Sequence, residues 1–162
     1  MSAGDKAQFI TPDAYPQMLE KGGAARALKV LRSAQTAMKA AVAMEACVAP
    51  MRAAVLQYVG EMEKSAADMA TIFDIAHEIR GLAETAGMIT MGRISDLLCH
   101  YMDETKRMGR SPDAAIVGLH VSAIGRAARA AEDDIGMGAV VTAELSALVC
   151  RKLNDLRTTT KL

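Results

Sequence analysis

The sequence contains no tryptophan, and only two phenylalanines and three tyrosines occur among its 162 residues. Sheet proteins of this length draw more heavily on aromatic and β-branched side chains, whereas alanine and methionine favour helices. Methionine alone occurs 12 times, hydrophobic residues make up 51% of the chain and charged residues 23%. This composition is typical of a globular chain rather than a disordered one. It predicts an all-α protein.

The chain also lacks an excess of either charge, because 19 lysines and arginines balance 19 aspartates and glutamates. Nucleic-acid-binding domains are normally basic, so we expect no nucleic-acid partner. No group of histidine, cysteine and acidic residues has metal-ligand spacing, and we expect no metal on this chain. His77 and Glu78 begin like a zinc-protease helix, but that motif needs a second histidine where Gly81 stands. Serine-hydrolase and phosphate-loop motifs are absent as well.

No run of about 18 uninterrupted apolar residues is present, and the N-terminus lacks a charged segment followed by an apolar one. We therefore expect no membrane span and no signal peptide. Cys47, Cys99 and Cys150 are far apart and odd in number, which indicates reduced thiols. Each lies in an apolar stretch, so we expect each to be a small buried side chain. These features favour a cytoplasmic protein.

Proline and glycine divide the chain into an irregular N-terminal extension, residues 1–23, and a single helical domain, residues 24–162. Pro50 is expected to end one helix or begin the next. Short connections favour antiparallel neighbours, so we expect an up-and-down antiparallel four-helix bundle with an additional N-terminal or C-terminal helix, or both. The expected helices cover about residues 24–48, 50–64, 65–86 (beginning at Ser65 or Asp68), 90–108, 112–131 and 139–156.

One segment carries a chemical pattern: His77 is followed by a cation, Arg80, after three residues and by Gly81 after four. An α-helix brings residues three and four apart onto one surface. At about 100° per residue, His77 lies roughly opposite the apolar stripe of its helix. Core packing therefore does not explain this histidine, and we expect it to be exposed. The stripe consists of Ile72, Ile75, Ile79, Leu82 and Ala86.

The side of the helix that carries His77 is also expected to carry Phe73, Glu84 and Met88. Glycine inside a helix costs about 1 kcal/mol relative to alanine. Gly81 therefore indicates a close approach by another molecule. The other two histidines differ from His77: residue 120 falls within the apolar stripe of its helix and is expected in the core, and residue 100 is expected in solvent.

The run from His77 to Gly87 resembles the histidine-containing phosphotransfer (HPt) domain family. The family pattern is histidine, two residues, lysine or arginine, glycine, and a second glycine six residues later. The resemblance covers about residues 50–131. Two positions depart from the pattern: lysine is commoner where Arg80 stands, and smaller residues are common where Leu82 stands. The next helix of the family is matched by Ile94, Leu97, Leu98, Cys99, Met102 and Glu104.

This resemblance implies a phosphorelay intermediate without autokinase activity. His77 would accept a phosphoryl group from the aspartyl phosphate of a response-regulator receiver domain or a hybrid histidine kinase, and pass it to another receiver. Arg80 would neutralise the phosphoryl charge, and Gly81 would leave room for the receiver. Any Mg²⁺ would sit on the receiver, so we expect no cofactor here, and a monomer. The partner-binding surface would comprise Phe73, Glu78, Glu84 and Met88.

Two other classes remain open. The run from His77 to Arg80 also looks like the phosphoacceptor box of a histidine kinase, but that box continues with a polar residue and proline rather than Gly81 and Leu82. The chain also lacks the glycine-rich motifs of an ATP-binding domain. The second class is a non-catalytic helical adaptor that binds a receiver, or another signalling protein, through the same face.

Overall fold

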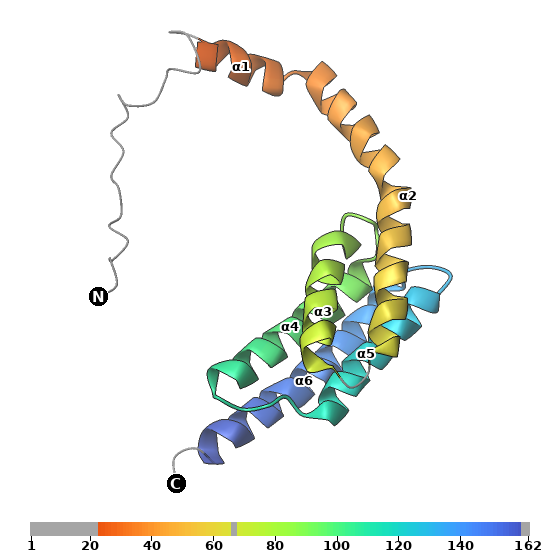
Figure 1. Ribbon diagram of the computed structural model, residues 1–162. Coiled ribbons are helices and arrows are strands. Elements are labelled where there is room, and N and C mark those ends of the chain that lie inside the picture. Colours follow the sequence, from red (N-terminus) through yellow and green to blue (C-terminus); the bar gives the residue numbers. More distant parts are fainter. Residues whose placement is uncertain (1–22, 66–67, 160–162) are drawn as a thin grey trace, which may run out of the picture. The chain divides into compact units, whose positions relative to one another are not determined.

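A computed structural model describes residues 23–65 and 68–159 of the chain (Figure 1). This part contains six helices and no strand, so the expected all-α class is confirmed. The expected irregular extension lies outside the described residues except for Gly23, which begins the first helix. The helices are α1 (Gly23–Leu31), α2 (Ala34–Lys64), α3 (Met69–Ala83), α4 (Ile89–Arg107), α5 (Ala114–Arg129) and α6 (Ile135–Thr159).

The chain divides into two compact units, Met1–Ala43 and Met44–Leu162. Within the first, α1 buries none of its residues, and a turn at Ser33 separates it from α2. The Ser33 hydroxyl accepts a hydrogen bond from the backbone N–H of Thr36 at 3.2 Å, which caps the new helix. The helix break expected near Pro50 is therefore wrong: the break lies at residues 32–33, and Pro50 lies inside α2.

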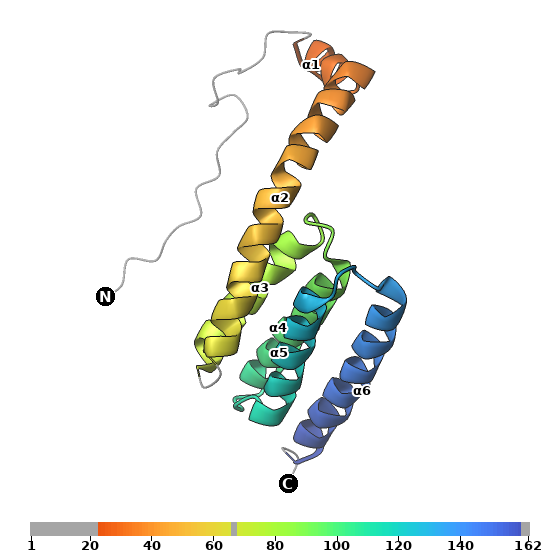
Figure 2. The ribbon, with the colours of Figure 1, turned by 90° about the vertical axis from the view of Figure 1, so that its right-hand side faces the viewer.

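The second unit contains one hydrophobic core. The last turns of α2 and each of the helices α3, α4, α5 and α6 contribute side chains to it. The helix α4 packs against α3, α5 and α6, and α5 also contacts α6. Figure 2 shows α4 and α5 between α3 and α6. The largest side chains buried in this core are Tyr101, Met62, Ile72, Ile79, Met91, Ile94, Leu98 and Ile124.

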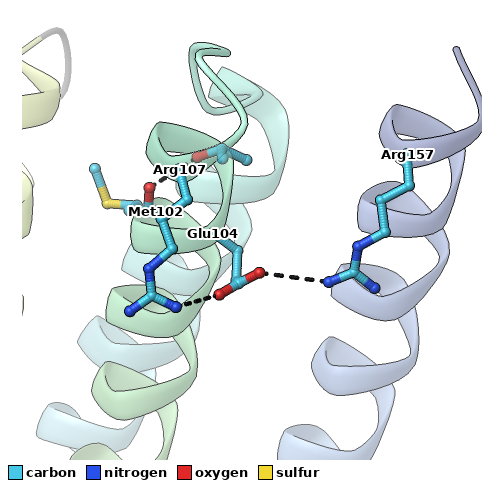
Figure 3. Close-up of polar contacts among 5 residues, drawn as sticks. Met102, Glu104, Arg107 and Arg157 are labelled. Carbon is cyan, nitrogen blue, oxygen red and sulfur yellow. Dashed lines mark hydrogen bonds and ion pairs between the residues drawn. The ribbon is translucent and has the colours of Figure 1, made fainter. Parts of the chain in front are cut away.

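Polar contacts fix α4 against its neighbours near its C-terminal end. Glu104 accepts from Arg107 at 2.6 Å and from Arg157 on α6 at 3.4 Å (Figure 3). The buried Tyr101 accepts from the backbone N–H of Asp113, the residue that caps α5, at 2.9 Å. Together these contacts join the end of α4 to the start of α5 and to α6.

The helix that carries His77 begins and ends with local capping motifs. Asp68, one of the two predicted starts, is the N-cap: its carboxylate accepts from the backbone N–H groups of the second and third residues that follow it, at 3.0 and 3.3 Å. Gly87 has φ of 72°, a left-handed conformation that glycine adopts at no steric cost. The N–H of Met88 donates to the carbonyl of Ala83 and that of Gly87 to Glu84, which is the Schellman arrangement. The regular part of α3 ends at Ala83, and the Schellman turn continues the helical path to Ala86, where the sequence predicted the end.

The last helix begins earlier than predicted, at Ile135 rather than about Ala139. The carboxylate of Asp134 accepts from the N–H of Met137 at 2.9 Å and stabilises this start. Gly138 therefore lies inside the helix. It is buried, and a Cβ at this position would overlap the side chain of Thr90 on α4. The glycine allows α6 to approach α4 closely.

The expectation that all three cysteines are buried is wrong for two of them. Cys99 is buried in α4, and burial raises the pKa of its thiol to about 11. Cys47 and Cys150 are exposed.

An apolar stretch of sequence need not be buried, and residues 34–51 of α2 are an example. By length and composition alone α2 is long and apolar enough to cross a membrane, which is weak evidence because core helices and signal sequences pass the same test.

Candidate functional site

His77 lies on the exposed side of α3, at the middle of the helix. The opposite side is the predicted stripe: Ile72, Ile75, Ile79 and Ala86 are at most 8% exposed, and Leu82 is half-buried against the core. The prediction that His77 is outside the core is confirmed. The two other histidines also lie as expected, because His120 is buried and His100 is exposed.

An aromatic ring sits beside the imidazole. The ring centroids of Phe73 and His77 are 6.5 Å apart and the ring planes are tilted by 44°. Phe73 is half-buried and packs against the core, so its ring is a fixed apolar neighbour of His77. Phe73 also lines an open hollow of about 400 Å³, together with Met102 and Lys106 on α4, and His77 is not among the residues that line it. The surface next to His77 is therefore partly apolar.

Arg80, one turn after His77, forms an ion pair with Asp96 on α4, with 3.4 Å between Nη1 and Oδ1. The Arg80 side chain is 37% exposed and that of Asp96 66%. The pair draws the guanidinium toward the α4 side of the α3 surface and leaves part of it in solvent. Asp96 was not identified from the sequence, because its contact with Arg80 depends on how α3 and α4 are paired.

Gly81 is exposed, and among the described residues no atom outside its local backbone lies within 4 Å of the position that a Cβ would occupy. Gly92 on α4 is the contrast. A Cβ there would lie 3.0 Å from Cγ of Glu84, so that glycine stands where the end of α3 and the start of α4 pack closely. Packing among the described residues gives no comparable reason for Gly81. The space beside it is open to another molecule.

Of the remaining predicted partner-binding residues, Glu78 on α3 and Glu84, directly after its last residue, are exposed. Met88 is a correction: its side chain is only 7% exposed and belongs to the core. The helical angle was extrapolated past the true end of α3. Met88 instead follows the left-handed Gly87, where the Schellman motif normally places an apolar side chain against the last turn of its helix.

Within residues 23–65 and 68–159, no group of three histidine, cysteine or acidic side chains is placed to hold a metal ion. The site thus consists of an exposed imidazole, a neighbouring aromatic ring, a tethered guanidinium and an open glycine on two successive turns of one helix. Comparison of this chain with protein-family models, with curated proteins and with solved structures finds no match.

Proposed function

We propose that this protein is a histidine phosphotransfer protein that carries a phosphoryl group on His77 between receiver domains. The observation that supports this most directly is the open surface around His77. The imidazole is exposed, and Gly81, one turn along the same side, has no neighbour that a side chain at this position would meet. The resemblance of residues 77–87 to the HPt pattern supports membership of this family. The open surface supports it too, because a receiver domain must approach the histidine closely.

Phosphoryl transfer to His77 requires the protein mainly to position the imidazole and to neutralise charge. A neutral imidazole nitrogen is a nucleophile, and Nε2 would attack the phosphorus of the aspartyl phosphate. A P–N bond forms while the bond from phosphorus to the aspartyl oxygen breaks, which leaves a carboxylate on the receiver. Phosphoryl transfer is accelerated mainly by alignment and by neutralising the phosphoryl oxygens. Arg80 is the cation within one turn of His77 on the same helix, and the partner would supply Mg²⁺.

The proposal includes a finer reading of the fold. In it, the last turns of α2 together with α3, α4 and α5 form the up-and-down bundle of a phosphotransfer domain, and α6 is an additional helix. Contributions from α2 to the shared core support this reading, as does the 2.9 Å ion pair between Glu63 on α2 and Arg129 on α5. The proposed partners are receiver domains, and the catalytic step uses no nucleotide.

The test is transfer from a panel of phosphorylated receiver domains to the full chain and to two variants. His77→Gln removes the proposed acceptor. His100→Gln is the matched control, because residue 100 is also an exposed histidine on a helix of the same unit. We expect acid-labile phosphate on the wild type and on His100→Gln, and none on His77→Gln. Incubation with labelled ATP alone should label none of the three.

Label that persists on His77→Gln would overturn the assignment of the acceptor. If no receiver labels the wild type but a receiver binds it equally well before and after His77→Gln, the phosphotransfer proposal fails. The adaptor reading then replaces it. Labelling by ATP alone would instead favour a kinase.

A further inference from the structure

Asp96 brings a second helix to the surface around His77. Its carboxylate on α4 lies 3.4 Å from Nη1 of Arg80 on α3. The side chain of Asp96 is 66% exposed, so packing does not explain its position. Aspartate is also a poor helix former, and local propensity does not favour it in the middle of α4. The contact with Arg80 therefore distinguishes Asp96 from an ordinary surface carboxylate.

The pairing of α3 with α4 places Asp96 close to the level of the imidazole. Arg80 pairs with Asp96, and Glu84 at the end of α3 lies against Gly92, where a Cβ would be 3.0 Å from the glutamate Cγ. The two pairs define one antiparallel register, because four residues forward on α3 correspond to four residues back on α4. In this register His77 lies level with the turn of α4 that follows Asp96.

The buried thiol of Cys99, on that same turn of α4, is affected by both charges of the pair. Burial is the main cause of its raised pKa, the guanidinium of Arg80 opposes the rise, and the carboxylate of Asp96 adds to it. The field of the ion pair thus extends along the two helices to the level of His77. A charge that arrives on the imidazole would therefore interact with this pair.

We propose that Asp96 is a positioning residue for Arg80: it holds the guanidinium while His77 is unmodified and yields it to a phosphoryl group on His77. This inference rests on the proposed function. A phosphoryl group brings nearly two negative charges and three acceptor oxygens, so the guanidinium should prefer it to a single carboxylate. Arginine can make the exchange because its planar fork carries five N–H donors. Asp96 acts on transfer through Arg80 rather than on the reacting atoms.

Competition between Asp96 and the phosphoryl group determines how strongly Arg80 stabilises the phosphohistidine. An exposed ion pair contributes little, so breaking this one changes an equilibrium constant by at most about fivefold. The stabilisation of the phosphohistidine by Arg80 is reduced by that factor. A relay intermediate must release the group that it accepts, and a cation shared with a neighbouring carboxylate keeps transfer reversible. Asp96 therefore favours release of the phosphoryl group.

The test phosphorylates His77 with two different donors, which separates the role of Asp96 from the relay itself. Phosphoramidate needs no protein partner: the imidazole nitrogen forms a bond to phosphorus, the bond from phosphorus to the nitrogen of the donor breaks, and ammonia leaves. It is used on the full chain with His100→Gln, where His77 is the remaining exposed histidine because His120 is buried. A phosphorylated receiver domain is the second donor.

Two quantities are measured: the proton affinity of the bound phosphoryl group by phosphorus NMR titration, and the equilibrium ratio of phosphohistidine to aspartyl phosphate with the receiver. Asp96→Asn releases Arg80, so it should lower the proton affinity and raise the ratio, each by about twofold to fivefold. Arg80→Gln should change both in the opposite direction, and the double variant should match Arg80→Gln alone. Asp103→Asn is the matched control, because it removes a carboxylate two turns further along α4, and it should behave as the wild type.

Unchanged values in Asp96→Asn would overturn the proposal, and so would an equal change in Asp103→Asn, which would indicate a general effect of charge. A change that persists in the Arg80→Gln background would also overturn it, because Asp96 would then repel the phosphoryl group directly. If phosphoramidate gives the expected pattern but no receiver labels His77, the relay proposal fails while Asp96 still positions Arg80. If neither donor labels His77, both proposals fail.

Discussion

Replacing Gly81 by glutamine should stabilise the protein while slowing phosphotransfer, and this opposition of signs is the sharpest test of the site. Gly81 lies in a helix, and in the part of the chain that the structure describes no atom outside its local backbone lies within 4 Å of a Cβ built there. A side chain at this position therefore meets no steric obstacle in the chain itself. Glycine is about 0.8–1.0 kcal/mol less favourable than alanine in a helix interior, and glutamine ranks close to alanine.

The free energy of unfolding should therefore rise by about 0.5–1 kcal/mol, or about 1–4 °C in Tm for a domain of this size. Transfer should change in the other direction. Residues four apart on a helix are neighbours, with about 5–6 Å between their Cβ atoms, so the new side chain would stand beside His77. Reacting atoms must come within about 3–3.5 Å, and a displacement of 1 Å can cost about 100-fold in rate. We expect transfer to slow by about 10- to 100-fold.

The measurement combines thermal or urea unfolding with the initial rate of transfer from one phosphorylated receiver. Gly118→Gln is the matched control, because Gly118 is also an exposed helical glycine without a neighbour within 4 Å of its Cβ position. It should gain similar stability and transfer at the wild-type rate. If Gly81→Gln transfers within about threefold of the wild type, or if Gly118→Gln slows equally, open space at Gly81 is not what transfer requires.

Two further predictions concern the core. Burial lowers the pKa of His120 below its ordinary value of about 6.5. Below pH 6.5 the unfolded chain therefore binds more protons than the folded chain. The free energy of unfolding should fall as the pH drops from about 6.5 toward 5, and it should be level above pH 6.5. Urea titrations should show this slope in the wild type and in His100→Gln but a shallower one in His120→Leu; equal slopes in all three would contradict the role of burial. Gly138→Val should lower the free energy of unfolding by about 1–3 kcal/mol, because the new side chain overlaps Thr90; an unchanged urea midpoint would show that α6 moves away at no cost.

The sequence was a good guide to α3 because local rules determine that helix. Its apolar stripe follows from the helical period, its start from the side chain of Asp68 and its end from the left-handed Gly87. The exposure of His77 follows from the same stripe. Met88 was misplaced because the period holds only within the helix. Beyond Ala83 the Schellman turn, rather than the helical angle, decides which side chain faces the core.

Features that depend on a second element were not predictable in this way. Asp96 reaches Arg80 from another helix, and its position is set by the register between α3 and α4. Cys47 and Cys150 lie in apolar sequence, but their exposure depends on which neighbours cover α2 and α6. The break at Ser33 was missed because Pro50 is the stronger breaker by propensity. The structure tolerates that proline inside α2 and begins α2 at a serine cap.

The ion pair between Arg80 and Asp96 adds a constraint that the sequence pattern lacks. An exposed pair of this kind contributes about 0–1 kcal/mol, because solvent screens it and both side chains lose freedom. The ion pair can therefore orient the guanidinium of Arg80, yet it is weak enough for another anion to displace Asp96. On the proposed function, a phosphoryl group on His77 would bring nearly two negative charges to the same turn of the helix and would compete with Asp96 for Arg80. A weak tether suits this role better than a buried salt bridge, which would keep the arginine from the phosphoryl group.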